Sequence, residues 1–102
     1  MKLSVVVCTF NRAESLRRML KSLQEIVIPD HLLCEVIVVD NNSNDDTRLV
    51  VEAFEKHFEL KIRYVFEDKK GLSHARNRGV KEASGEIIAF TDDDVIVDKH
   101  WI

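Results

Sequence analysis

The 102-residue sequence lacks any long apolar run. No stretch approaches the roughly 18 residues that a membrane-spanning helix needs, and the first residues have neither the basic start nor the apolar segment of a signal peptide. The net charge is only −3, and Lys and Arg do not gather in one block, so a nucleic-acid partner is not favoured. We therefore expect no membrane segment, no secretion signal and no nucleic-acid surface in this chain.

Cysteine is also scarce. Cys8 and Cys34 are the only two, and both lie in or beside apolar segments without potential metal ligands nearby. We expect buried, reduced thiols at these positions, with a disulfide between them as the less favoured alternative. Reduced thiols fit a cytoplasmic location, and for a full-length protein we extend that expectation to the inner face of the membrane.

Glycine is missing from residues 9–12, the turn that follows the first apolar segment. The dinucleotide fingerprint G-x-G-x-x-G and the phosphate loop G-x-x-x-x-G-K-[ST] are therefore both absent from this turn. Phosphates cannot be cradled by backbone amides here in either of those two ways.

The composition is that of one globular domain, which we place over residues 1–102. Hydrophobic residues make up 45% of the sequence and charged residues 32%, and a chain of this length can bury a core. Three segments are nearly all apolar, as in strands buried on both faces, whereas a fourth alternates apolar and charged residues, as in a strand at a sheet edge. In chain order the predicted strands are residues 3–8, 35–39, the alternating 60–66, and 86–90.

Helical spacing of apolar residues separates these strands, most clearly over residues 16–23, 49–54 and 72–83. The order βαβαβαβ predicts an α/β fold with a doubly wound, mainly parallel Rossmann-like sheet and strand order 3-2-1-4.

Small residues at Ala75 and Gly79 should let the third helix lie close to the sheet. Asn11 and Glu14 have the spacing of a helix capping box, and Gly85 is expected to follow the third helix as its terminating glycine.

Polar side chains follow three of the predicted strands at their carboxyl ends, which meet at one edge of a parallel sheet. They are Thr9 and Asn11, then Asp40 and Asn42, then Asp92, Asp93 and Asp94. Three adjacent carboxylates repel one another unless they point into water or bind a cation. Carboxylates can hold Mg²⁺ or Mn²⁺ on one side while diphosphate oxygens bind the other, and Asp40 could accept a hydrogen bond from the ring N–H of a base.

Simpler interpretations stay open for most of these residues. The aspartate triplet could be a solvated turn, and Asp40 with Asn42 could merely begin the second helix, where acids are favoured. Asn11 could be a helix cap, and Arg76 could tie the third helix to neighbouring loops.

Four segments, in this order, resemble the family-2 inverting glycosyltransferases of the GT-A fold: V-V-V-C-T-F-N-R, V-I-V-V-D-N-N-S-N-D, G-L-S-H-A-R-N-R-G-V and S-G-E-I-I-A-F-T-D-D-D-V. The resemblance covers essentially the whole chain. It implies the amino-terminal, nucleotide-sugar-binding part of an enzyme that transfers a sugar, usually from a UDP-sugar, to the hydroxyl of a saccharide or lipid-linked saccharide acceptor with inversion. Such enzymes act in cell-wall or polysaccharide biosynthesis. The family's acceptor-binding half and catalytic base follow the aspartate motif, after which only residues 95–102 remain here, so we expect the chain alone to be inactive.

The resemblance also implies roles for single residues. Thr9 and Asp40 would hold the nucleobase, Asp93 would face the ribose, and the metal ligands, for Mn²⁺ or Mg²⁺, would be Asp94 and Asp92. Because this family often has a small residue between its motif aspartates, the register of the metal ligand is ambiguous here. The nucleotide-binding residues implied in full are Thr9, Asn11, Asp40, Asn42, Lys70, Gly71, Arg76, Asp92 and Asp93.

Two functions of other classes stay open beside this one. A signalling receiver domain also gathers acids around Mg²⁺, but it needs an acidic pair after its first strand and a lysine after a fifth. Here Cys8 and Thr9 end the first strand, and no fifth strand is predicted. A nucleotide-binding module without catalytic activity would differ only in sequence outside this chain.

Overall fold

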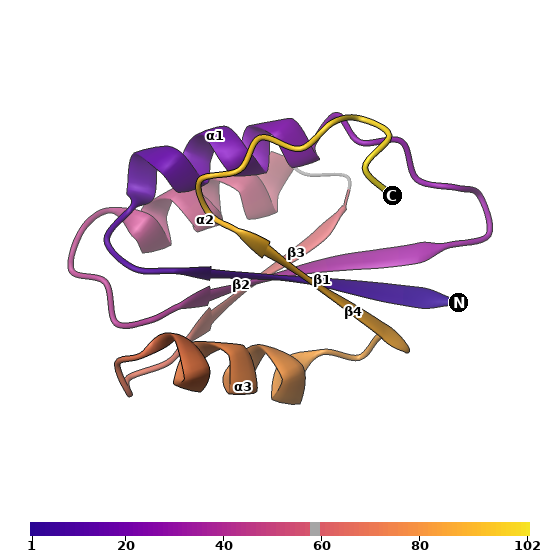
Figure 1. The fold of residues 1–102 in the computed structure, drawn as a ribbon. Coiled ribbons are helices and arrows are strands. Elements are labelled where there is room, and N and C mark those ends of the chain that lie inside the picture. Colours follow the sequence, from indigo (N-terminus) through magenta and orange to yellow (C-terminus); the bar gives the residue numbers. More distant parts are fainter. Residues whose placement is uncertain (58–59) are drawn as a thin grey trace.

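Four parallel strands form one sheet in the order β3-β2-β1-β4 (Figure 1). The computed structural model describes residues 1–57 and 60–102. Its elements are β1 (Lys2–Thr9), α1 (Ala13–Leu23), β2 (Leu33–Asp40), α2 (Thr47–His57), β3 (Lys61–Phe66), α3 (Leu72–Glu82) and β4 (Ile87–Asp92). The predicted fold class and strand order are therefore confirmed. None of the described helices combines the length and the apolar character of a membrane span.

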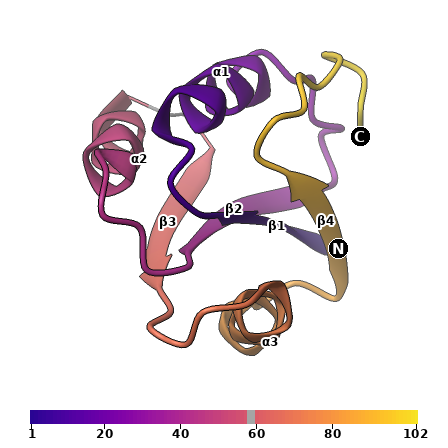
Figure 2. The ribbon, with the colours of Figure 1, turned by 60° about the vertical axis from the view of Figure 1, so that its left-hand side comes forward.

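Two layers of helix cover the two faces of the sheet. Helices α1 and α2 lie on one face and α3 on the other, as Figure 2 shows. Alternate strand residues supply the two cores: Val5 and Val36 pack on the side of α1 and α2, whereas Val6, Ile37 and Val39 pack with residues of α3. Because successive side chains of a strand point to opposite faces, these apolar strands can bury both.

Strand β4 differs from the prediction. We expected it to be buried on both faces, but Ile87 is 46% exposed and Phe90 is 44% exposed. The reason is its position, since β4 pairs with β1 alone and forms one edge of the described sheet.

Close approach of α3 to the sheet depends on glycine, as predicted. A Cβ at Gly79 would clash with a methyl group of Val6. Gly85 was predicted to be the glycine that terminates α3. This prediction is wrong, because α3 ends at Glu82 with Ala83 as its C-cap. At Gly85 a side chain is excluded by β1 instead, where a Cβ would lie 2.6 Å from Ser4 Oγ.

The predicted capping box at the start of α1 is wrong. Arg12 occupies the N-cap position without a capping side chain, and Asn11 Oδ1 accepts a hydrogen bond from Asn44 N at 2.9 Å. A carboxylate from the loop after β2 replaces the cap: Asp45 accepts from Ala13 N at 3.2 Å and from Thr47 N at 3.0 Å. One acid therefore serves the first turns of both α1 and α2, where the helix dipoles favour negative charge.

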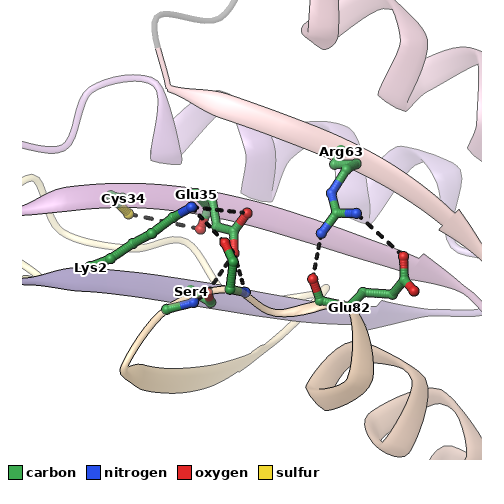
Figure 3. Close-up of polar contacts among 8 residues, drawn as sticks. Lys2, Ser4, Cys34, Glu35, Arg63 and Glu82 are labelled. Carbon is green, nitrogen blue, oxygen red and sulfur yellow. Dashed lines mark hydrogen bonds and ion pairs between the residues drawn. The ribbon is translucent and has the colours of Figure 1, made fainter.

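The amino-terminal edge of the sheet holds a buried carboxylate that sequence reasoning did not single out. Glu35 on β2 is 3% exposed, and its Oε2 accepts a hydrogen bond of 2.6 Å from Ser4 Oγ (Figure 3). The same oxygen accepts from both N and Oγ of Ser84 at 2.9 Å. Lys2 Nζ lies 4.0 Å from Oε1. Burial alone would raise the pKa of Glu35, but the bonds from Ser4 and Ser84 prevail, with help from Lys2, and lower that pKa to about 2.

Candidate functional site

A cleft of about 520 Å³ opens at the carboxyl ends of the strands. Its position follows from the topology, because the chain leaves β1 toward α1 on one face and reaches β4 from α3 on the other (Figure 2). Its volume falls within the range of about 300–1,000 Å³ typical of small-molecule sites. The lining residues are Cys8, Thr9, Phe10, Arg12, Asn41, Lys70, Gly71, Leu72, Ala75, Asp92, Asp93 and Asp94.

The middle aspartate of the triplet is buried and anchored to β1. Asp93 is 6% exposed, and its Oδ2 accepts a hydrogen bond of 2.8 Å from Thr9 Oγ1. Arg12 Nη1 lies 3.6 Å from Asp93 Oδ1 and 3.6 Å from Asp94 Oδ2. Burial, reinforced by the charges of Asp94 and Asp92, raises the pKa of Asp93 despite the opposing effects of Thr9 and Arg12. The fold therefore holds a carboxylate here in surroundings that disfavour its charge.

The other two aspartates are exposed beside the same cleft. Among the side chains that the structure describes, no three of His, Cys, Asp or Glu are placed to enclose a metal ion. The residues present do fit a metal held partly by a ligand: Mg²⁺ and related ions are commonly bound through one or two carboxylates together with phosphate oxygens. Asp92 and Asp94 supply oxygen donors of that kind, so the triplet fits a shared site and not a closed protein cage.

The opposite wall of the cleft comes from the loop between β3 and α3. Lys70 Nζ lies 5.5 Å from the centroid of the Phe10 ring, and Gly71 adopts a φ of +130°, which favours glycine. Leu72 and Ala75, from the first turn of α3, also line the cleft. Positive charge from Lys70 and Arg12, together with the amino-terminal end of a helix, suits an anionic ligand.

Sequence reasoning missed Asn41, which is buried in this wall. It named Asp40 and Asn42 on either side, but Asn41 continues the alternation of Ile37 and Val39 toward the α3 side of the sheet. Its side chain makes three hydrogen bonds to the loop that carries Lys70. The alternation within β2 was the sequence signal that could have identified it.

Asp40 lies at the same edge of the sheet but outside the cleft lining. It is 2% exposed, and its Oδ2 accepts a hydrogen bond of 2.6 Å from Tyr64 OH while Oδ1 accepts one of 3.0 Å from Ser43 N. Burial and the bond to Asp40 raise the pKa of Tyr64, so this phenol stays protonated and donating at neutral pH. A base-binding role for Asp40 stays a prediction.

Three further predicted site residues also lie outside the lining. Asn42 has a φ of +67° and donates from Nδ2 to Asp68 O at 3.4 Å, whereas Asn11 accepts the bond from Asn44 described above. The Arg76 guanidinium lies 5.7 Å from the centroid of the Phe90 ring. The structure therefore brings Thr9, Lys70, Gly71 and the aspartate triplet together around one cleft, and it places Asn11, Asn42 and Arg76 nearby with partners of their own.

Both cysteines are free thiols, as predicted, but both are only partly buried, which the prediction of buried thiols did not anticipate. Cys8 lines the cleft, and burial raises its pKa to about 11, with the nearby charges of Asp93 and Asp92 acting in the same direction and that of Arg76 opposing. The Cys8 thiol is therefore neutral at physiological pH and is not activated as a nucleophile.

Comparisons with known proteins agree on one family. The model described as Glycosyl transferase family 2 matches residues 4–102. A β-1,3-glucosyltransferase of Campylobacter jejuni, named for the acceptor GalNAc(5)-diNAcBac-PP-undecaprenol, is 42% identical over 95 residues, which are 91% of this chain and 29% of that protein.

Solved structures share the fold. TarS of S. aureus in complex with UDP superposes with a TM-score of 0.86 at 32% identity, over 98% of this chain and 29% of that one. The mannosyltransferase PcManGT from Pyrobaculum calidifontis, in complex with GDP-Man and Mn²⁺, gives a TM-score of 0.80 at 37% identity, over 90% of this chain and 27% of that one. The chain thus spans less than a third of the length of these relatives.

Proposed function

We propose that this chain, which belongs to glycosyl transferase family 2, is the donor-binding part of a glycosyltransferase and holds a nucleoside diphosphate sugar in the cleft between β1, β4 and α3. The observation that carries the proposal is the cleft itself. Its walls combine two exposed carboxylates, one buried carboxylate and two cationic side chains in a space of about 520 Å³. The bound UDP of TarS and the GDP-Man of PcManGT support a nucleotide sugar as the ligand class.

Each wall has a distinct task in this proposal. Asp94 and Asp92 would hold Mn²⁺ or Mg²⁺, and the Mn²⁺ in the PcManGT structure supports a divalent ion. When bound, such an ion offsets the charge of a departing diphosphate. Lys70 and Arg12 place positive charge beside the same phosphates, while Thr9 and Asp93 form the floor on which the nucleoside rests. We favour a uridine nucleotide, with Asp40 contributing to recognition of the base.

The reaction we propose for the whole protein is transfer of the sugar to an acceptor hydroxyl with inversion, in a single displacement at the anomeric carbon. Binding and orienting the donor falls to this chain, the single domain 1–102. Acceptor binding and removal of the acceptor proton are assigned to sequence outside it, so the chain alone should bind a nucleotide without turning over. We place the protein in the cytoplasm, at the inner face of the membrane.

The receiver-domain alternative is not favoured. Cys8 and Thr9 end β1 where such a domain needs an acidic pair, and the matched family is one of glycosyl transferases.

Calorimetry with UDP, with and without Mn²⁺, tests the proposal. We expect binding that Mn²⁺ strengthens, and we expect Asp94→Ala to lose most of that Mn²⁺ effect because it removes a carboxylate from the shared site. Asp30→Ala is the matched control, since Asp30 is equally an exposed aspartate but lies before β2 at the amino-terminal edge of the sheet. A folded wild-type sample that binds no UDP under either condition would contradict the proposal.

A further inference from the structure

The loop of residues 67–71, between β3 and α3, is held by one buried side chain from the neighbouring strand. Asn41 is 7% exposed. Its Nδ2 donates to Lys69 O at 2.7 Å and to Glu67 O at 3.4 Å, and its Oδ1 accepts from Gly71 N at 2.9 Å. The amide therefore spans the loop from its first residue to its last, and both its donor and its acceptor ends are used.

The amide is itself fixed in place. Asn41 N donates to Thr9 O at 2.9 Å, which ties the residue to the end of β1 on the cleft floor. Within the loop, Glu67 Oε2 accepts from Lys69 N at 2.9 Å. Gly71, at a φ of +130°, is turned so that its N–H meets Asn41 Oδ1. Asn41, a residue about 30 positions earlier in the chain, therefore makes three of the hydrogen bonds that shape this loop, and Asn42 Nδ2 adds one to Asp68 O.

Lys70 is the residue whose position this arrangement controls. Its backbone lies between two groups that bond to Asn41, Lys69 O and Gly71 N, and its ammonium lies over the Phe10 ring in the cleft wall. A lysine is a flexible point charge, so its effect on a bound phosphate depends on where its backbone is held. Losing the Asn41 amide would leave the carbonyls of Glu67 and Lys69 and the N–H of Gly71 without their present partner.

We propose that Asn41 is a positioning residue: it sets the affinity of the cleft for a nucleoside diphosphate by holding residues 69–71, and with them the Lys70 ammonium, against the cleft. This inference rests on the function proposed above. It goes further than that function because it assigns part of the nucleotide affinity to Asn41, whose side chain acts by positioning the charge of Lys70.

A double-mutant cycle on UDP binding tests the inference, with each affinity measured at several salt concentrations. Asn41→Ala and Lys70→Ala should each weaken UDP binding about tenfold, and the double variant should be about as weak as either single one, because both remove the same interaction. Both should also flatten the salt dependence of binding, since the contribution lost is a screened charge. Asn44→Ala, in the exposed part of the loop between β2 and α2, is the matched asparagine control and should leave the affinity and its salt dependence unchanged.

Hydrogen exchange supplies a readout that does not need UDP. In Asn41→Ala the Gly71 amide should exchange faster, while amides in the middle of β1 and β2 keep their protection. Asn41→Asp keeps the acceptor for Gly71 N but turns a second oxygen toward Lys69 O, and it should weaken UDP binding at least as much as Asn41→Ala. If Asn41→Ala does not fold, Asn41→Asp tests the positioning role in its place.

Three results separate the possible failures. Unchanged UDP affinity and salt dependence in a folded Asn41 variant would overturn the positioning role and leave the proposed function intact. Fully additive effects of Asn41→Ala and Lys70→Ala would also overturn it, because the two residues would then act independently. A wild-type chain that binds no UDP would overturn the proposed function and this inference with it.

Discussion

Two buried carboxylates lie at opposite ends of the same parallel sheet, and the fold treats them in opposite ways. Glu35, at the amino-terminal edge, lies beside the Ser4 hydroxyl and the Lys2 ammonium (Figure 3), and it also accepts hydrogen bonds from Ser84. Asp93, at the carboxyl edge, has a hydrogen bond from Thr9 but stands between two further carboxylates. The pKa of Glu35 is lowered and that of Asp93 is raised.

The two carboxylates therefore differ in what they contribute. Glu35 stabilises the fold, whereas Asp93 belongs to the cleft that we propose as the binding site. Ionised Glu35 gains from its surroundings, so its charge contributes to folding. The aspartate triplet concentrates negative charge that the chain only partly neutralises through Arg12, as expected where a cation binds. Three predictions sharpen or break this comparison.

The largest effect should come from removing Glu35. Glu35→Ala leaves the Ser4 hydroxyl and the Ser84 N–H without their buried acceptor, and we expect the free energy of unfolding to fall by about 4 kcal/mol. Urea unfolding measures the loss, and Glu25→Ala, at an exposed glutamate, should change stability by less than about 0.5 kcal/mol. Equal small losses in both variants would show that the Glu35 network does not stabilise the fold.

The pH dependence of stability should follow the lowered pKa of Glu35. The usual glutamate pKa of 4.5 falls to about 2 in the fold, so ionised Glu35 contributes about 3 kcal/mol above pH 4.5, and the contribution is lost as the pH falls from 4.5 toward 2. The difference in unfolding free energy between wild type and Glu35→Gln should therefore shrink over that interval. A difference that stays constant from neutral pH down to pH 2 would contradict the assignment.

The smallest effect, and one of opposite sign, is expected at Asp93. Its raised pKa means that the fold disfavours the charged form, so Asp93→Asn, which can still accept from Thr9, should raise the free energy of unfolding by roughly 0.5–1 kcal/mol at pH 7. The same variant should weaken UDP binding in the presence of Mn²⁺, because the aspartate triplet loses one of the negative charges that attract the ion. A lower free energy of unfolding for Asp93→Asn would contradict this prediction, because it would show that Asp93, like Glu35, stabilises the fold.

Much of this architecture could be predicted from the sequence because the strands carry strong patterns. Buried runs such as residues 35–39 and the alternating residues 60–66 specify which strands are central and which lies at an edge, and the strand order follows. The aspartate triplet and Thr9 were predicted to meet for the same reason, since the carboxyl ends of parallel strands share an edge.

The remaining details depend on contacts between distant loops, which local patterns do not encode. Asp45 replaces the predicted cap of α1 from the loop after β2, and Asp40 accepts a hydrogen bond from Tyr64 on β3 and lies outside the cleft lining. The alternation within β2 indicates which face of the sheet Asn41 occupies, but its contacts arise only when the loop of residues 67–71 folds against it. Exposure of β4 was missed because a buried strand and an edge strand can have equally apolar sequences.

Paramagnetic broadening of amide NMR signals tests the central claim most directly, because it locates a bound Mn²⁺ ion on the sheet. We predict that Mn²⁺ added together with UDP broadens the signals of residues 92–94 and 70–71 and leaves those around Glu35 and Ser84 sharp. Broadening at the amino-terminal edge, or broadening at residues 92–94 that does not change when UDP is added, would contradict a shared metal and nucleotide site at the carboxyl edge.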